Sequence, residues 1–126
     1  MTRALADPVG LWLLSSHRDA ASESALSVAA AGLPGLRVDR TFIAGPEPLA
    51  VGDGTIWIID FKTTDQGSLS DTAFDALQRA RYSGQLETYA EIRRRLPDGG
   101  MPIQLGLYFP LASRLIHWRS GTNVVT

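Results

Sequence analysis

The stretch TIWIIDFKTT, residues 55 to 64, decides the fold, because its composition is that of a strand in the centre of a sheet. Residues 56–63 are nearly continuously apolar and rich in β-branched and aromatic types, which favour strands. Side chains alternate between the two faces of a strand, so Asp60 and Lys62 point the same way, with Cα atoms about 6–7 Å apart. Ile56 and Ile58 share that face, which indicates that it is buried.

The Asp60 and Lys62 pair has two interpretations. On a solvated sheet edge it is a salt bridge worth roughly 0–1 kcal/mol. The apolar residues on the same face disfavour this, because an unpaired buried charge is costly. In the second interpretation both groups act on one ligand, and further polar partners from other segments are needed.

The remaining pattern predicts an α/β (α+β) fold in which one long helix covers a mixed sheet. Further strands are expected over residues 10–16, 36–44, 103–109 and 114–118, and residues 22–30 fit a strand or a weak helix. In the second of these strands, Leu36, Val38 and Phe42 are expected on one face, and Asp39 on the other with Thr41 and Ile43.

The long helix is expected from Asp71 to Leu96, where no proline occurs, with Ser68 as its N-cap. Gly84 is its weak point and is expected to mark a bend or a close contact. The apolar face with helical spacing comprises Phe74, Leu77, Tyr82, Leu86, Tyr89, Ala90 and Ile92.

Length and composition predict one domain over residues 1–126, with 44% hydrophobic and 20% charged residues. No apolar run reaches the roughly 18–20 residues that span a bilayer, and the N-terminus lacks a secretory signal, so a cytoplasmic location and no membrane partner are expected. There are no cysteines, which excludes disulfides, thiol catalysis and cysteine-based metal sites.

The net charge of −1 provides no general footprint for nucleic acid, so such binding requires a local patch. The candidate cations are Arg79, Arg81 and the run 93–95. The same run also fits a solvated helix end.

Asp39 is the expected partner of Asp60, because the twenty residues between them suffice for a hairpin that lays their strands side by side. Two converging carboxylates repel unless a divalent cation lies between them, and hard oxygen ligands suit Mg²⁺ or Mn²⁺. Tyr82, Gln85 and Tyr89 follow helical spacing and would line one face. Alone, Asp39 with its neighbouring arginine also fits a surface pair, and the two tyrosines fit core aromatics.

The motifs VDRTF (38–42), WIIDFKT (57–63) and YSGQLETYA (82–90), in this order, resemble the nuclease domain of the RecB/AddA helicase–nucleases. This group belongs to the PD-(D/E)XK phosphodiesterase superfamily, and the resemblance covers about residues 20 to 118. It implies a restriction-endonuclease-like sheet and metal-dependent hydrolysis of DNA phosphodiesters. The activity that the resemblance implies is that of an exonuclease-type module in DNA recombination and repair.

The resemblance also implies roles for individual residues. Asp39 and Asp60 bind Mg²⁺ (or Mn²⁺) together with the backbone carbonyl of Phe61, and Lys62 is the catalytic lysine that positions the attacking water. Gln85 and Tyr89 support the site and approach DNA. A helicase subunit or domain is the implied protein partner.

This sequence departs from the family in one feature. RecB/AddA domains have an upstream helix that supplies a histidine to the metal, whereas only about nine residues precede the expected strand at 10–16. That helix is therefore expected to be missing or truncated, and His17 is not assigned to the metal. Two alternatives follow: a catalytically inactive RecB-like domain that binds DNA or a partner, or a structural module with a buried Asp–Lys ion pair.

Overall fold

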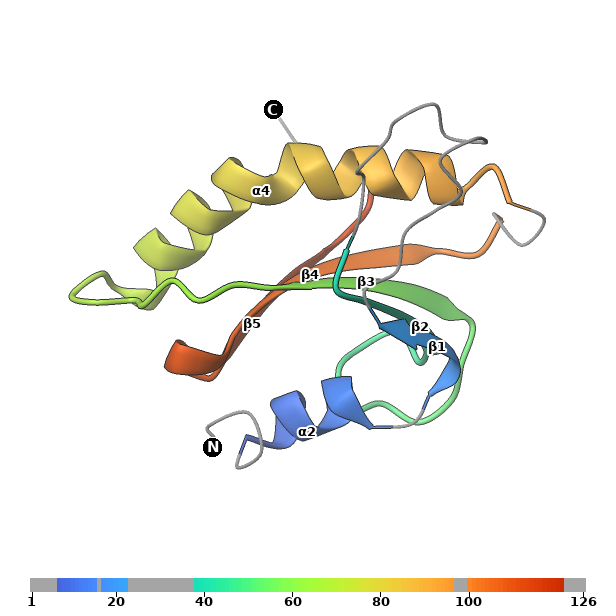
Figure 1. Ribbon diagram of the computed structural model, residues 1–126, viewed down its shortest axis with the longest axis horizontal. Helices are drawn as coiled ribbons and strands as arrows, with labels where there is room; N and C mark the ends of the chain where they lie inside the picture. Colours follow the sequence, from blue (N-terminus) through green and yellow to red (C-terminus); the bar gives the residue numbers. More distant parts are fainter. Residues whose placement is uncertain (1–6, 16, 23–37, 97–99, 122–126) are drawn as a thin grey trace.

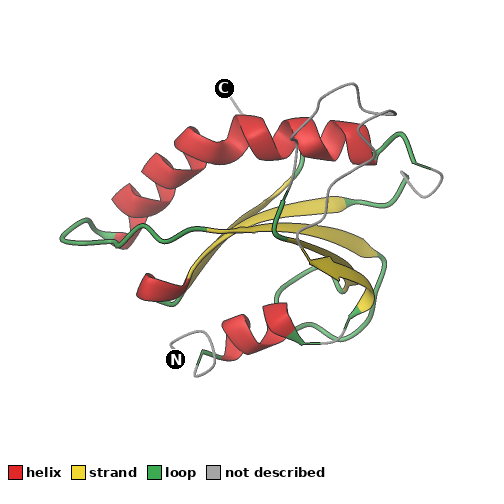
Figure 2. Cartoon of the chain, viewed as in Figure 1, coloured by secondary structure: helices red, strands yellow, loops and turns green. Residues whose placement is uncertain are grey.

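The computed structural model describes residues 7–15, 17–22, 38–96 and 100–121, and has three layers (Figures 1 and 2). A five-stranded sheet in the order β1-β2-β3-β4-β5 lies between one short and one long helix. The mixed α/β class is therefore confirmed. The elements are α2 (Pro8–Leu14), β1 (Arg18–Ser22), β2 (Arg40–Ala44), β3 (Thr55–Phe61), α4 (Asp71–Arg93), β4 (Ile103–Phe109), the 3-10 turn η1 (Pro110–Ala112) and β5 (Arg114–Arg119).

Strand β3 is the centre of the sheet, as its apolar run predicts. It pairs antiparallel with β2 and parallel with β4, and all its residues except Phe61 are buried. Ile56 and Ile58 belong to the core cluster under α4, whereas Trp57 and Ile59 belong to a second cluster on the α2 side. Asp60 continues the row of Ile56 and Ile58, so its face is the buried one covered by α4.

The expectation of a strand over residues 10–16 is wrong, because helix α2 occupies residues 8–14. Asp7 is its N-cap, with a carboxylate that accepts from the Val9 N–H, and Pro8 occupies the first turn. Proline at this position is pre-organised for a helix, and Asp–Pro is therefore a start signal that outweighs the short apolar run. A helix of seven residues thus precedes the sheet.

Strand β2 is shorter than expected, and its alternation does not extend to Val38. The strand begins at Arg40, and the chain bends at Asp39. Val38 consequently packs in the α4-side cluster with Ile43, whereas Phe42 lies in the α2-side cluster. The prediction that Val38 shares a face with Phe42 is wrong, because the bend breaks the period of two. Leu36 and residues 23–30 lie outside the described residues.

Helix α4 forms where the apolar period of the sequence predicts it, with adjusted ends. Its N-cap is Ser70, not Ser68, and the Ser70 hydroxyl accepts from the Ala73 N–H at 3.1 Å. The helix ends at Arg93, three residues before the expected end. At Gly84 a Cβ would have open space around it, so this residue makes no close contact with the sheet.

The buried face of α4 differs at one turn from the predicted stripe. Leu77 is 46% exposed, whereas Gln78 is 1% exposed. Gln78 stands four residues from both Phe74 and Tyr82, so helical geometry places it on their side of the helix.

The C-terminal hairpin agrees with the sequence. β4 spans exactly the predicted residues 103–109, and β5 extends one residue beyond the predicted 114–118. The two strands are antiparallel and are joined through η1. Among the described residues, no helix has the length and apolarity to cross a membrane.

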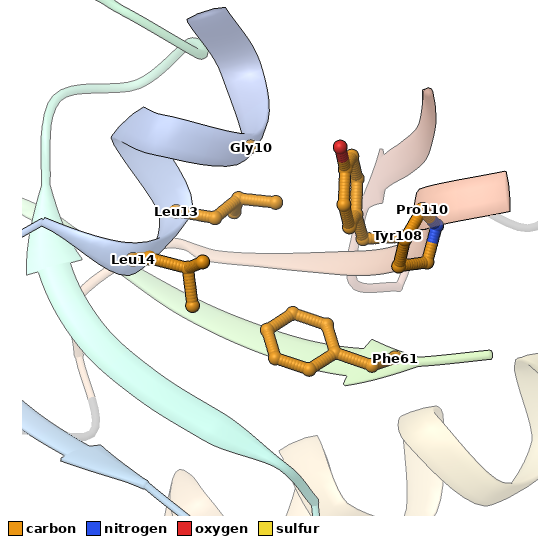
Figure 3. Close-up of a pocket in the computed structure, with 6 residues that line it drawn as sticks. All are labelled: Gly10, Leu13, Leu14, Phe61, Tyr108 and Pro110. Atoms are coloured by element: carbon orange, nitrogen blue, oxygen red, sulfur yellow. The ribbon is translucent and has the colours of Figure 1, made fainter. Parts of the chain in front are cut away.

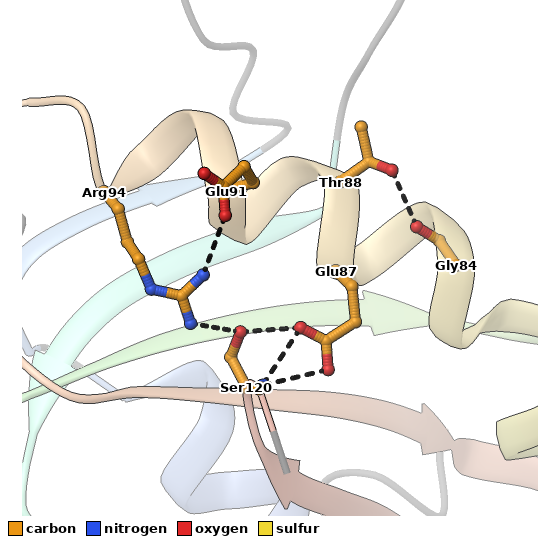
Figure 4. A network of polar contacts seen from close by, with 7 residues as sticks. Gly84, Glu87, Thr88, Glu91, Arg94 and Ser120 are labelled. Carbon is orange, nitrogen blue, oxygen red and sulfur yellow. Dashed lines mark hydrogen bonds and ion pairs between the residues drawn. The ribbon is translucent and has the colours of Figure 1, made fainter. Parts of the chain in front are cut away.

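Hydrogen bonds near both ends of α4 join one flank of the helix to β5 and the residues that follow it. Near its start, the Arg114 guanidinium donates two hydrogen bonds of 2.6 Å to Asp75. Near its end, the Glu87 carboxylate accepts hydrogen bonds from Trp118 Nε1, from the Ser120 hydroxyl and from the backbone N–H of Gly121. Figure 4 shows the bonds of Glu87 to Ser120, which also accepts from Arg94.

Removal of the Glu87 carboxylate is expected to destabilise the fold measurably. Glu87→Ala leaves two buried donors, Trp118 Nε1 and the Ser120 hydroxyl, without their acceptor, and each loss costs about 1–3 kcal/mol. We expect the free energy of unfolding in urea to fall by about 2–4 kcal/mol.

The matched control is Glu91→Ala on the same helix. Glu91 has an exposed carboxylate that pairs with Arg94 at 3.5 Å, and its loss should cost under about 1 kcal/mol. Equal effects of the two variants would contradict this role of Glu87.

Candidate functional site

Asp60 and Lys62 stand at the carboxyl end of β3, on the face covered by α4. Asp60 is 7% exposed, and its Oδ2 atom lies 3.0 Å from Lys62 Nζ. The backbone N–H of Lys62 donates to the Tyr108 carbonyl at 2.9 Å, which continues the β3–β4 ladder by one residue. Asp60 and Lys62 form an ion pair. The prediction that both side chains point to the same face of the strand is therefore confirmed.

Asp39 reaches the same strand end from β2. Its backbone N–H donates to the Ile59 carbonyl at 3.1 Å, and its Oδ2 accepts the backbone N–H of Phe61 at 2.8 Å. Asp39 is therefore bonded to both chain neighbours of Asp60, and its carboxyl group lies close enough to raise the pKa of Asp60. The structure thus brings together the two aspartates that the sequence predicts as partners.

The environment of Asp60 favours its protonated form. Burial raises the pKa of Asp60 above its ordinary value of 3.8, and the Asp39 carboxyl raises it further. Lys62 acts in the opposite direction, because an adjacent ammonium group stabilises the carboxylate. Burial is the largest of these effects, so the Asp60 carboxyl group has a higher pKa than an exposed aspartate does.

Helix α4 adds Tyr82 to the site. Lys62 Nζ lies 4.1 Å from the centroid of the Tyr82 ring, a cation–π contact. Tyr82 is half-buried, Gln85 is exposed and Tyr89 is 0% exposed within the α4-side core. The three residues therefore differ in burial and do not form the common face that was expected. Of the three, only Tyr82 contacts Lys62. The supporting roles of Gln85 and Tyr89 stay predictions.

Lys62 is the only lysine of the chain, which has eleven arginines. An ammonium is a compact donor with three N–H groups and moves its proton more readily than a guanidinium. The single lysine therefore stands at the strand end where Asp60 and Asp39 come together.

The donor groups at this strand end suit a hard cation. Across the described ranges no three His, Asp or Glu side chains gather closely enough to hold an ion, so the protein ligands would be the two carboxylates and a backbone carbonyl. The N–H and C=O of one strand residue point to the same side, so the Phe61 carbonyl faces the side of Asp39. Mg²⁺ is commonly bound by one or two carboxylates with water completing the octahedron, so these residues fit it.

The two histidines lie away from this site. His17 stacks on Phe42 with ring centroids 4.2 Å apart, and Phe42 belongs to the α2-side cluster. His17 is therefore on the face of the sheet opposite to Asp60. His117 on β5 contacts the Trp57 ring and Gln104, and burial lowers the pKa of its imidazole.

A pocket of about 200 Å³ lies on the opposite face of the sheet, beneath α2 (Figure 3). Its walls are formed by Gly10, Leu13, Leu14, Phe61, Tyr108 and Pro110. The Tyr108 hydroxyl donates to the Asp7 carboxylate at 2.6 Å, so it is already engaged. These walls are apolar and offer no donor for a phosphate, and the pocket is therefore not part of the candidate site.

The candidate arginines divide into engaged and exposed groups. Arg79 stacks over Trp118 at 4.9 Å from the ring centroid, and Arg94 bonds Glu91 and Ser120. Arg81 and Arg95 are exposed. The exposed members are the ones that a negatively charged partner can reach.

Comparisons with known proteins leave the site to be interpreted from its own chemistry. No protein-family model, no curated protein and no solved structure matches this chain. The bonds of Asp39 to both chain neighbours of Asp60 and the ion pair of Asp60 with Lys62 are therefore the observations from which a function is inferred.

The raised pKa of Asp60 predicts a specific pH dependence of stability. Its folded-state pKa is above the unfolded value, so its contribution is fully present below about pH 4 and is lost as the pH rises through the folded-state pKa. Asp60→Asn has no such titration. In metal-free urea unfolding, the free energy of the wild type should therefore fall relative to that of Asp60→Asn between pH 3.5 and pH 7. Asp53→Asn, in the exposed loop before β3, is the control and should follow the wild type. A wild type that gains stability relative to Asp60→Asn over this range would show that the Lys62 ion pair outweighs burial.

Proposed function

We propose that this chain is a Mg²⁺- or Mn²⁺-dependent DNA phosphodiesterase domain of the PD-(D/E)XK superfamily, of the RecB/AddA type. The observation that carries the proposal is that Asp39 bonds both chain neighbours of Asp60, beside the ion pair of Asp60 with the single lysine, Lys62. These are the residues to which the motif resemblance assigns the metal site and the catalytic amine. The mixed sheet under a long helix is compatible with such a fold.

Asp39, Asp60 and the Phe61 carbonyl would hold the cation, which would supply Lewis acidity at the scissile phosphate. Asp60 would have to be ionised for this binding, so the raised pKa of its carboxyl group makes protons compete with the cation. Lys62 donates a hydrogen bond to the attacking water and so fixes the position of its oxygen. Tyr82 limits the movement of the Lys62 ammonium by the cation–π contact.

The reaction is hydrolysis and needs no further reactant. The water oxygen forms a bond to phosphorus, one phosphorus–oxygen ester bond breaks, and the leaving alkoxide takes up a proton. The products are a phosphate monoester and an alcohol. An exonuclease-type role in DNA recombination and repair, a helicase subunit or domain as partner, and a cytoplasmic location complete the proposal. Arg81 and Arg95 are exposed cations available to the DNA backbone.

A second function is a domain that binds DNA or a partner protein without cleaving it. The observation that favours it is that a protein group engages one oxygen of each carboxylate, Lys62 on Asp60 and the Phe61 N–H on Asp39. Such internal bonds compete with a cation for the same oxygens. Metal affinity therefore discriminates between the two functions.

Calorimetric titration with Mn²⁺ and a DNA cleavage assay test the proposal together. The wild type should bind Mn²⁺ more tightly at pH 8 than at pH 5, because the raised pKa of Asp60 makes protons compete with the metal. Asp39→Asn and Asp60→Asn should abolish binding and cleavage. Lys62→Met should retain binding and lower kcat on the order of 100-fold to 1000-fold, the effect of removing one positioned donor.

Asp53→Asn removes a carboxylate at the opposite end of β3 and is the matched control, with wild-type binding and cleavage expected. A wild type that binds no Mn²⁺ and leaves single- and double-stranded DNA intact would refute the enzyme and favour the non-cleaving function. Cleavage that survives both Asp60→Asn and Lys62→Met would place the chemistry elsewhere in the chain.

A further inference from the structure

Gln78 is an unusual residue of α4. Its side chain is 1% exposed, yet its Oε1 atom has no hydrogen-bond partner among the described residues. Burial of an amide oxygen without a donor costs about 1–3 kcal/mol, so native proteins nearly always satisfy such atoms. The oxygen is therefore open to a donor from outside the described residues, and an ordered water is the smallest one.

The neighbours of Gln78 on the helix locate it. Phe74, one turn before, packs edge-on against Phe109 with ring centroids 4.9 Å apart. Tyr82, one turn after, packs under Lys62 Nζ at 4.1 Å. Lys62 follows Phe61, which is in register with Tyr108, so Lys62 and Phe109 are neighbours across the ends of β3 and β4. Gln78 thus stands one helical turn from each of two residues that contact these strand ends.

The rotation of α4 supports this placement. Asp75, Arg79 and Glu87 contact β5 through Arg114 and Trp118, so their flank faces the β5 edge of the sheet. At about 100° per residue, Gln78 lies about 180° around the helix from Glu87, whereas Tyr82 lies within about 20° of Asp75, near the centre of the buried arc. Gln78 is therefore turned away from the β5 edge, and Tyr82 beside it contacts the residue that follows β3.

Gln78 and Lys62 are chemically complementary through a water molecule. The Lys62 ammonium has three N–H donors and no acceptor, and Asp60 takes one of them. A water that accepts from a second N–H of Lys62 has its own two protons to donate. The free oxygen of Gln78 can accept one of them, which would orient the water by two bonds.

We propose that Gln78 is a positioning residue for the attacking water: its Oε1 accepts a hydrogen bond from the water that Lys62 holds. The proposal rests on the proposed phosphodiesterase function. Two bonds fix the orientation of a water where one leaves it free to rotate about the lysine. The lone pair of the water that is not bound to Lys62 is then held toward the phosphate.

Gln78→Met tests the role because methionine has nearly the same length and lacks the oxygen. Removal of an unpaired buried polar atom should leave the melting temperature unchanged or raise it, and Mn²⁺ affinity should be kept. The expected loss is in kcat, on the order of 10-fold to 100-fold with KM unchanged, since the water is not a group of the substrate. A metal-free crystal structure of the wild type should show a water bonded to both Gln78 Oε1 and Lys62 Nζ. The variant should lack that water.

Gln78→Glu keeps an oxygen acceptor at the same place and should recover most of the lost activity. Its pH–rate profile should gain an acidic limb that the wild type lacks, which a merely structural residue would not produce. Gln104→Met is the matched control, because Gln104 is a partly buried glutamine on β4 that bonds His117, away from Lys62. It should cleave at the wild-type rate.

The outcomes separate this inference from the function on which it rests. An active wild type whose kcat changes less than twofold in Gln78→Met, with no water between the two residues, overturns the role of Gln78 alone. A wild type that neither binds Mn²⁺ nor cleaves DNA overturns both. If Gln78→Met does not fold, the wild-type crystal structure and the pH profile of Gln78→Glu decide. Absence of the bridging water and of the new acidic limb then overturns the proposal.

Discussion

The burial of β3 on both faces is the constraint on which the rest of the structure depends. Residues 55–60 are all buried, so the strand needs an apolar cover on each side and a hydrogen-bonded neighbour along each edge. α4 and α2 are the covers, and β4 and β2 are the edges (Figure 1). Asp60 is buried because it continues the row of Ile56 and Ile58. A carboxyl group at this position is a consequence of the same alternation that builds the core.

Neighbouring groups offset the free-energy cost of burying the Asp60 carboxylate. Burial penalises its charge, and the nearest compensation is the ammonium of Lys62, two residues along the same face. The bend of the chain at Asp39 places a second carboxyl group against the first and lets its oxygen take the Phe61 N–H. Two acids and one base in contact carry an excess negative charge when fully ionised, which a proton or a cation relieves.

The sequence predicts the elements whose burial pattern repeats over many residues, namely β3, β4, β5 and α4, because a long period outweighs local preferences. It misplaces α2, since four apolar residues fit either a strand or a helix and the Asp7–Pro8 start signal decides. Within the site, spacing alone predicts that Asp60 and Lys62 share a side. The contact of Tyr82 and the burial of Gln78 depend on the rotation of α4, which bonds to β5 far along the chain determine.

The two flanks of α4 differ in how completely their polar groups are satisfied. On the β5 flank, the Asp75 carboxylate takes both hydrogen bonds of Arg114 and the Glu87 carboxylate takes three donors, so this flank contributes stability. On the other flank, the Gln78 amide oxygen is buried without a partner among the described residues, and one turn further along Tyr82 contacts Lys62, the partner of the buried Asp60 carboxyl group. Selection for stability alone would replace these groups with apolar ones of similar volume.

β3 and β4 are parallel and end together under this flank, and the carboxyl ends of parallel strands are where open sheets bind ligands. The concentration of unfavourable polar groups at this edge is therefore typical of a functional site, held in place by the satisfied flank of the same helix.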